Sequence, residues 1–184
     1  MYDLVSTKIP GVKIIQNKPF IDNRGELQLH YNKEEFERAG LPTDFVQQNV
    51  SQSFYGVLRG LHIQANNPQG KLIKCIAGTI QDVWVDLRQD SPTFKKWEST
   101  QLSMERHEAL YLPPGLAHGF LCLTNFCYVH YSCTTPYDKE SDGGVRWDDP
   151  KIGIIWDFES GFTPVVSPKD QALPRLDDYL SQLG

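Results

Sequence analysis

The feature that most constrains the fold of this chain is its division into many short apolar runs by closely spaced turn signals. Turn signals rich in Gly, Pro, Asn and Asp lie at residues 22–25, 66–70, 113–115 and 142–144. The runs between them are rich in Val, Ile, Leu, Tyr and Trp, which favour strands. Short strands at this spacing are typical of a sandwich or a barrel, so we expect an all-β protein.

Helical patterns are confined to two short stretches. Residues 33–38 read KEEFER and end just before Gly40, a helix stop signal. We expect a second short helix over residues 176–183. The chain has 184 residues, enough for one domain that buries its core without metal or disulfide support.

The charge balance and the beginning of the chain limit the classes of partner. The net charge of −5 argues against a nucleic-acid binder, which usually presents a basic patch, but it allows an anionic small ligand. The first 15 residues lack the apolar core and small-residue cleavage site of a signal peptide, and no run approaches the length of a membrane span. We therefore expect a cytoplasmic protein that does not bind a membrane.

The four cysteines are also consistent with a cytoplasmic protein. Cys75, Cys122, Cys127 and Cys133 lie in apolar runs and form no CxxC pair. The simplest interpretation is four reduced cysteines in the core. Disulfides or a zinc site remain alternatives.

Alternation along the predicted strands sorts side chains by face. In the run 127–133 the odd positions are the more apolar, so we expect Tyr131 to point inward. In the run 80–88, Asp82 and Trp84 share one face and Val83 lies on the other. In the run 71–77, Lys71 shares the face of apolar residues.

The run 57–64 carries a cation and an imidazole. Strict alternation places His62 on the face of Leu58 and Arg59 on the opposite face. One interpretation is a site in which Arg59 binds a phosphate while His62 and Lys71 meet a reacting carbonyl. The other is an edge strand with solvated polar residues.

Four polar residues on the predicted central strands could together carry proton chemistry beside a carbonyl: His62, Lys71, His118 and Tyr131. A histidine can take a proton, a lysine can stabilise the resulting oxyanion, and a tyrosine can return a proton. Asp170, in Ser-Pro-Lys-Asp, could orient a histidine and fix its tautomer. From the local sequence alone, an Asp in this position is more often a turn or helix-capping residue.

The segment PPGLAHGF contains a PxGxxH pattern that resembles the second motif of the cupins. The cupin first motif has an HxH pair, whereas the matching region here reads His62-Ile63-Gln64. About four His or Glu ligands cannot be assembled, so we expect no catalytic metal. For His118 itself, a buried hydrogen-bonded histidine is an alternative to a functional one.

Longer stretches resemble the dTDP-4-dehydrorhamnose 3,5-epimerase family of sugar-nucleotide epimerases. They are GVLRGLHIQ (56–64), PQGKLIKCIAGTIQDVWVDLRQDSPTFKKW (68–97), LYLPPGLAHGFLCL (110–123) and GVRWDDPKIGIIWDF (144–158). DNRGEL near the start and SPKD near the end extend the match to nearly the full length. The combination of RGLH, DLRxxSPTF, PxGxAHGF and WxDP is highly specific to this family.

The resemblance implies a cupin-like jelly-roll β-sandwich with a few short flanking helices. It implies a homodimer without metal or cofactor that epimerises a nucleotide-linked 4-keto-6-deoxyhexose at C3, C5 or both, in deoxysugar biosynthesis. We expect one domain over 1–184, with N-terminal strands and a short helix in 1–50, the jelly-roll core in 51–135 and a C-terminal extension in 136–184.

The resemblance also implies residue roles. His62 matches the catalytic base, Asp170 the carboxylate that pairs with it, Tyr131 the general acid, and Lys71 the lysine near the C4 oxygen of the sugar. The matched substrate-binding positions are Arg59, His118, Arg24, Gln47, Asn49 and Tyr137. Arg59 and His118 match polar positions of the pocket, and Arg24, Gln47 and Asn49 match nucleotide-binding positions, some of which reach across the dimer.

Several positions depart from the family pattern. Gln48 replaces an Asp, Ser132 replaces a Lys after the acid, and Gln81 replaces a Phe; Leu29 stands where the family has a Glu. Ile63 replaces the aromatic residue after RGLH, and Pro136-Tyr137 replaces a pair of tyrosines. We interpret most of these positions as lining the nucleotide or sugar pocket. The substrate could then carry CDP or GDP, or be a dideoxyhexose or a heptose.

Three other functions compete with the epimerase. A 3,4-ketoisomerase on a similar sandwich would move the carbonyl instead, but Tyr131 and the PxGxAHGF match weigh against it. A non-catalytic cupin-like module would bind the sugar without exchanging its protons. A metal-dependent cupin would need a ligand set.

Overall fold

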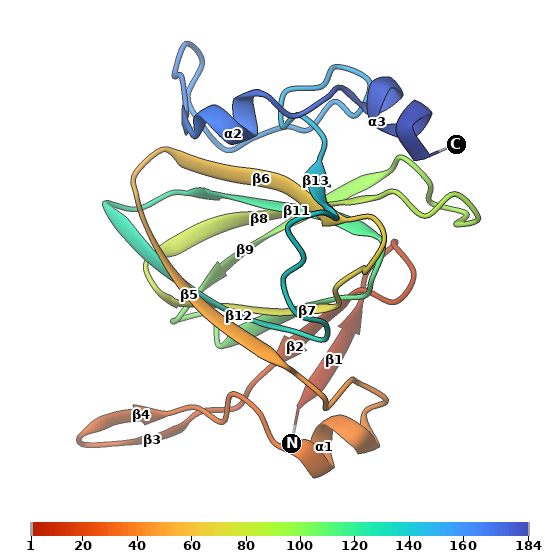
Figure 1. Cartoon of the computed structure of the whole chain (residues 1–184). Helices are drawn as coiled ribbons and strands as arrows, with labels where there is room; N and C mark the ends of the chain where they lie inside the picture. Colours follow the sequence, from red (N-terminus) through yellow and green to blue (C-terminus); the bar gives the residue numbers. More distant parts are fainter. Residues whose placement is uncertain (1, 184) are drawn as a thin grey trace.

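Two β-sheets packed face to face form the body of the molecule in the computed structural model, which describes residues 2–183 (Figure 1). In order across the first sheet, the strands are β1 (Asp3–Ser6), β2 (Lys13–Gln16), β10 (Glu108–Leu112), β7 (Lys71–Ala77), β12 (Phe126–Cys133) and β5 (Gln47–Phe54). Across the second sheet they are β13 (Asp142–Gly144), β6 (Val57–Gln64), β11 (Leu116–Cys122), β8 (Thr79–Asp86) and β9 (Trp97–Ser103), and β14 (Val165–Val166) also pairs with β6.

Along the chain the core strands alternate between the two sheets, except that β8 and β9 are neighbours in the second sheet. The strands β5, β7, β10 and β12 lie in the first sheet, whereas β6, β8, β9 and β11 lie in the second. Strands far apart in sequence therefore become neighbours, as β11 does with β6 and β12 with β7. This connectivity is that of a double-sheet jelly roll, so the expected cupin-like sandwich is confirmed.

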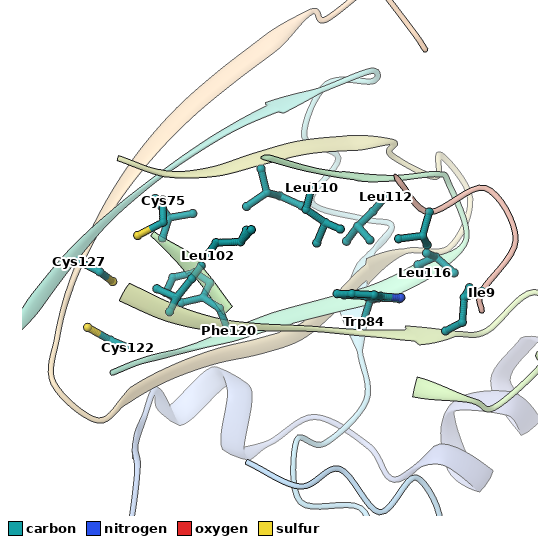
Figure 2. Close-up of a cluster of buried hydrophobic side chains, with 14 residues drawn as sticks. Ile9, Cys75, Trp84, Leu102, Leu110, Leu112, Leu116, Phe120, Cys122 and Cys127 are labelled. Carbon is teal, nitrogen blue, oxygen red and sulfur yellow. The ribbon is translucent and has the colours of Figure 1, made fainter. Parts of the chain in front are cut away.

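The space between the two sheets holds the main core. Trp84 from the second sheet packs among Leu110 and Leu112 from the first, and Cys75, Cys122 and Cys127 gather toward one end of the same cluster (Figure 2). All four cysteines are buried and free. Tyr131 packs against this core, as its face of the strand predicts.

The C-terminal segment covers the other face of the second sheet (Figure 1). The segment includes α2 (Pro168–Gln171) and α3 (Leu176–Leu183). Val83 and Val85 of β8 pack there with Trp156 and Leu176, whereas Trp84 faces the main core. The predicted alternation along this strand is confirmed.

The other short helix, α1 (Lys33–Arg38), lies against the outer face of the first sheet, where Phe36 is fully buried. Its start is fixed by Asn32, whose side chain accepts a hydrogen bond from the Glu35 amide. Both predicted helices are therefore confirmed. A separate hairpin of β3 (Phe20–Asp22) and β4 (Gly25–Leu27) projects away from the body (Figure 1).

One expected turn is a strand. Residues 142–144 form β13, which pairs with Gln64, Ile63 and His62 of β6. A Cβ atom on Gly144 would lie 1.8 Å from the Leu61 carbonyl oxygen, so this glycine permits a close approach of two backbones. The prediction of a turn here was wrong because Gly residues signal both turns and close packing.

The helices of the described residues are all short. None of those in residues 2–183 is long and apolar enough to cross a membrane.

Candidate active site

A cleft opens between the two sheets and has two connected lobes. His62 from the second sheet and Lys71 and Tyr131 from the first line both lobes. The outer lobe has a volume of about 200 Å³ and the inner one about 160 Å³. The structure thus brings the three predicted proton-transfer residues into one cavity, with the imidazole and the phenol on opposite walls.

His62 is oriented by a carboxylate from the far end of the chain. Its Nε2 lies 2.8 Å from Asp170 Oδ1, and the Gly60 amide donates to Asp170 Oδ2 at 3.0 Å. Burial raises the pKa of Asp170, but the hydrogen bonds from His62 and Gly60 lower it to a net value below the usual one. An ionised carboxylate only accepts, so Nε2 carries the proton and Nδ1 keeps the free lone pair.

The position of Asp170 follows from a short helix. Ser167 caps α2, and its hydroxyl accepts a hydrogen bond from the Asp170 amide at 3.0 Å. The Asp170 side chain is thereby left to reach β6, and the residue is 4% exposed. Of the two interpretations of Asp170, the histidine partner is the one that the structure supports.

A β-bulge corrects the predicted face of Arg59. His118 pairs with His62 and Phe120 with Arg59, so β6 has one more residue than β11 over this stretch. The extra residue reverses the alternation, and Arg59 lines the inner lobe on the same side as His62. The expectation of opposite faces was wrong because strict alternation assumes an unbroken ladder.

Arg59 links the two sheets. Its Nε donates to Ser53 Oγ at 2.9 Å, and an Nη donates to the Gln52 carbonyl at 3.0 Å, both on β5. The guanidinium is therefore fixed at the edge of the cleft with donors to spare, a suitable arrangement for an anionic group.

His118 belongs to a second histidine–aspartate pair. Its Nε2 lies 2.9 Å from both carboxylate oxygens of Asp82. Asp82 is fully buried, and desolvation raises its pKa even though His118 and Lys71 oppose this. His118 is thus both buried and hydrogen-bonded, and it also lines the inner lobe.

Lys71 and Tyr131 present their polar groups to the cleft from the first sheet. Within residues 2–183, neither the Lys71 ammonium nor the Tyr131 hydroxyl forms a hydrogen bond, so both are available to a ligand. Burial lowers the pKa of Lys71, although Cys133, Asp82 and Asp142 counter the effect. Burial raises the pKa of Tyr131, which keeps the phenol protonated at neutral pH.

The outer lobe contains three of the predicted substrate-binding side chains, Gln47, Asn49 and Tyr137. Gln47 donates to Asn49 at 3.1 Å and accepts from the Tyr137 amide at 2.8 Å. Asp142 accepts from the Tyr137 hydroxyl at 2.8 Å and also pairs with Lys169. The lobe therefore combines amide groups, an aromatic ring and a cation.

Arg24 is the one predicted site residue that the structure does not bring to the cleft. It lies at the turn of the β3–β4 hairpin, where its guanidinium pairs with Asp22 and is exposed to solvent. It lines neither lobe of the cleft.

Three departures from the family pattern lie outside the cleft, contrary to expectation. Gln48 and Ser132 are direct cross-strand partners on the outer face of the first sheet. Gln81 faces the C-terminal segment, where it bonds the backbone of Ile155 and Asp157. The interpretation that these three residues line the pocket was wrong, because alternation carries each to the reverse face. These three positions give no reason to expect a different substrate, whereas two other departures, Ile63 and Tyr137, do line the outer lobe.

Three residues around the site had been given no role from the sequence: Asp82 beside His118, and Asp142 and Lys169 in the outer lobe. Asp82 had a usable signal, since an acid on the inward face of an apolar strand requires a partner. Lys169 had been considered only as the residue that precedes Asp170. Asp142 had been assigned to a turn at residues 142–144. Within residues 2–183, no three His, Cys, Asp or Glu side chains gather closely enough to hold a metal ion.

Comparison with known proteins points to one family. The family model described as dTDP-4-dehydrorhamnose 3,5-epimerase matches residues 6–178. A dTDP-4-dehydrorhamnose 3,5-epimerase from Methanothermobacter thermautotrophicus is 44% identical over 170 residues, which is 92% of each chain. The enzyme of that name from Salmonella typhimurium is 43% identical over 182 residues, 98% of each chain.

A solved structure gives the same result. The chain is similar, with a TM-score of 0.94 and 37% identity, to the dTDP-6-deoxy-D-glucose-3,5-epimerase of Legionella pneumophila. The match covers 100% of this chain and 97% of that one, whose crystals contain dTDP-4-keto-L-rhamnose.

Proposed function

The chain belongs to the dTDP-4-dehydrorhamnose 3,5-epimerase family, and we propose that His62 and Tyr131 are the base and the acid with which it inverts its substrate. The protein is an isomerase of deoxysugar biosynthesis that inverts C3, C5 or both in a nucleotide-linked 4-keto-6-deoxy sugar. The observation that carries the residue assignment is the position of His62, paired with Asp170, on the wall of the cleft opposite Tyr131 and Lys71.

The first step removes a proton from a carbon beside the ketone. The C–H bond breaks, its proton goes to Nδ1 of His62, and its electron pair moves onto the C4 oxygen as an enolate. Asp170 holds the imidazole in the required tautomer and stabilises the imidazolium that forms. General base assistance of this kind contributes about 10²–10⁴-fold.

The second step returns a proton from the opposite wall. The Lys71 ammonium stabilises the C4 oxyanion, and a well-aimed donor of this type contributes about 2.7–4 kcal/mol. The Tyr131 hydroxyl gives its proton to the other face of the enolate, and a new C–H bond forms with inverted configuration. Solvent then resets the imidazolium and the phenolate, so one proton is lost and one is gained.

Solvent exchange tests the assignment directly. The protein is incubated in D₂O with dTDP-4-keto-6-deoxyglucose, and NMR follows deuterium at C3 and C5. The wild type should exchange and invert, His62→Ala should not exchange, and Tyr131→Phe should lose inversion more than exchange. Exchange that survives in His62→Ala would remove His62 as the base.

For the nucleotide, we propose dTDP, because the matched family and relatives are described as epimerases of a dTDP-linked sugar, and because the departures Gln48, Ser132 and Gln81 lie outside the cleft. A thermal-shift panel of UDP, dTDP, CDP and GDP tests this choice. A ligand that binds only the folded state raises its apparent stability by mass action, so dTDP should give the largest shift. A larger shift with CDP or GDP would contradict the proposal.

We also propose a homodimer, in which the β3–β4 hairpin of one copy reaches the cleft of the other. Phe20, Ile21 and Leu27 of this hairpin are 71%, 73% and 69% exposed. A two-stranded hairpin with such apolar groups is marginal alone in water, and exposed apolar patches mark contact surfaces. A second copy would cover these residues and would receive Arg24 beside its nucleotide.

Sedimentation and hybrid activity test the dimer together. The wild type should sediment as a dimer, and Arg24→Ala should weaken dTDP binding. Mixing and re-equilibrating Arg24→Ala with His62→Ala should restore part of the activity, because a hybrid has one cleft with both residues intact. A monomer, or hybrids without recovered activity, would contradict the shared site.

We propose a cytoplasmic location as well. The four free, buried cysteines fit a reducing compartment. Fractionation of expressing cells tests it.

A further inference from the structure

A second cavity lies on the reverse face of the first sheet, away from the cleft. We call it the outer cavity; its volume is about 420 Å³. One wall is the outward face of β7 and β12, and the other is the segment that contains His30, Tyr31 and Phe45. Tyr31 is fixed there by a hydrogen bond to the Thr43 carbonyl at 2.9 Å.

Lys74 lines the outer cavity as a buried ammonium without a carboxylate partner. The residue is 3% exposed, and its Nζ donates to Gln28 Oε1 at 2.8 Å. The Asn17 amide, in the orientation that its neighbours favour, places its oxygen 3.2 Å from the same Nζ. Within residues 2–183 no acid is within ion-pair distance of Lys74. Burial of an unpaired charge is unfavourable by several kcal/mol, so this site lacks a counter-ion.

Two imidazoles share the cavity with this lysine. His30 comes from the covering segment and His130 from β12. Burial lowers the pKa of both histidines, and the positive charge of Lys74 lowers that of His30 further. Glu26 is the acid that acts on Lys74, and it does so from beyond contact. The lining of the outer cavity thus combines apolar side chains with two imidazoles and one ammonium that has no acidic partner.

We propose that the outer cavity binds a small monocarboxylate with an apolar body. The carboxylate would accept hydrogen bonds from the Lys74 ammonium, with His30 and His130 beside it. The apolar part would lie against Leu72 and Phe45. This site is separate from the cleft, since β7 and β12 present Lys71 and Tyr131 to one face and Lys74 and His130 to the other.

Benzoate is the probe for this site, and neutral benzamide is its matched control. Each is titrated into the full-length protein at pH 7 by calorimetry, and the imidazole proton resonances are followed by NMR. Benzoate should bind about tenfold or more tightly than benzamide, because a charged hydrogen bond contributes about 1.5–3 kcal/mol. Two of the five histidines should shift with benzoate.

The variant Lys74→Met should lose this preference while it keeps dTDP binding in the cleft. A second test needs no variant. Burial lowers the pKa of Lys74 to about 8, so the affinity of the wild type for benzoate should fall about tenfold or more between pH 7 and pH 9.5. Benzoate remains ionised over this range, so the change reports the protein.

Three results would overturn the proposal. The first is equal affinity of the protein for benzoate and for benzamide. The second is an affinity for benzoate that is the same at pH 7 and at pH 9.5. The third is a set of histidine resonances that shift with protein concentration but not with benzoate. The last result would mean that a second copy of the chain supplies the counter-ion. None of these measurements depends on epimerase activity, so failure here leaves the proposed function intact.

Discussion

The two histidine–aspartate pairs of the cleft are built from the same residue types but differ in their surroundings. His62 and His118 are direct cross-strand partners, yet their side chains are 33% and 11% exposed. The Asp170 carboxylate accepts a hydrogen bond from a backbone amide as well as from its histidine, and its pKa is lowered. Among the described residues the Asp82 carboxylate is hydrogen-bonded only to His118, and burial raises its pKa. We infer that the first pair is arranged to move a proton and the second to hold a buried ring in place.

The largest expected effect separates the two imidazoles. His62→Gln should lower kcat for epimerisation by about 10²–10⁴-fold, the usual contribution of a general base. His118→Gln should lower it less, because His118 only binds and shapes the inner lobe. Steady-state kinetics with both variants measures the ratio. Equal losses of kcat in the two variants would contradict the distinction between the His62–Asp170 and His118–Asp82 pairs.

Substitution of the two carboxylates should lower kcat in the same order as substitution of the two histidines, with the larger loss in the His62–Asp170 pair. Asp170→Asn should lower kcat by about 10²-fold or more and change the pH–rate profile, because an amide does not stabilise an imidazolium. Asp82→Asn should lower kcat less and leave the shape of the profile unchanged. A profile altered by Asp82→Asn would show that the second pair also takes part in proton transfer.

A third prediction concerns Gly60, which lies in the β-bulge of β6 near His62. Gly60 has a φ of 121°, and a Cβ atom there would lie 2.6 Å from Gly119 Cα and 2.8 Å from the His118 carbonyl oxygen. Gly60→Ala should therefore lower the free energy of unfolding by about 1–3 kcal/mol. Urea denaturation measures this loss. Gly143→Ala is the matched control, since nothing lies within 4 Å of its added carbon.

The smallest expected effect is the dependence of stability on pH. The lowered pKa of Asp170 stabilises the fold above the unfolded value of about 3.9, and this stabilisation is lost as the pH falls through the folded value. The raised pKa of Asp82 acts oppositely, because ionisation of the buried group is unfavourable as the pH rises.

Comparison of unfolding free energies at pH 3, below the unfolded pKa of an aspartate, and at pH 7 tests this difference. Relative to the wild type, Asp170→Asn should be more destabilising at pH 7 than at pH 3. Asp82→Asn should be less destabilising at pH 7 than at pH 3. We expect changes of about 1 kcal/mol. The same sign for both variants would contradict the contrast between the carboxylates.

Local patterns in the sequence were sufficient for much of the architecture. Alternation placed Tyr131 inward and set Trp84 and Val83 on opposite faces, because side-chain direction in a strand repeats every two residues. The short helix over residues 33–38 followed from its composition and the Gly40 stop. The family motifs added the residue roles, which periodicity alone did not supply.

Only the tertiary structure decided which residues meet. Asp170 reaches His62 across 108 positions, and Asp82 reaches His118 across 36, so neither contact is visible in a local window. One extra residue near Gly60 turned Arg59 into the cleft, and the jelly-roll connections left Arg24 outside it. The physical reason is that side-chain period is a property of a short stretch of backbone, whereas register, bulges and strand order depend on partners far along the chain.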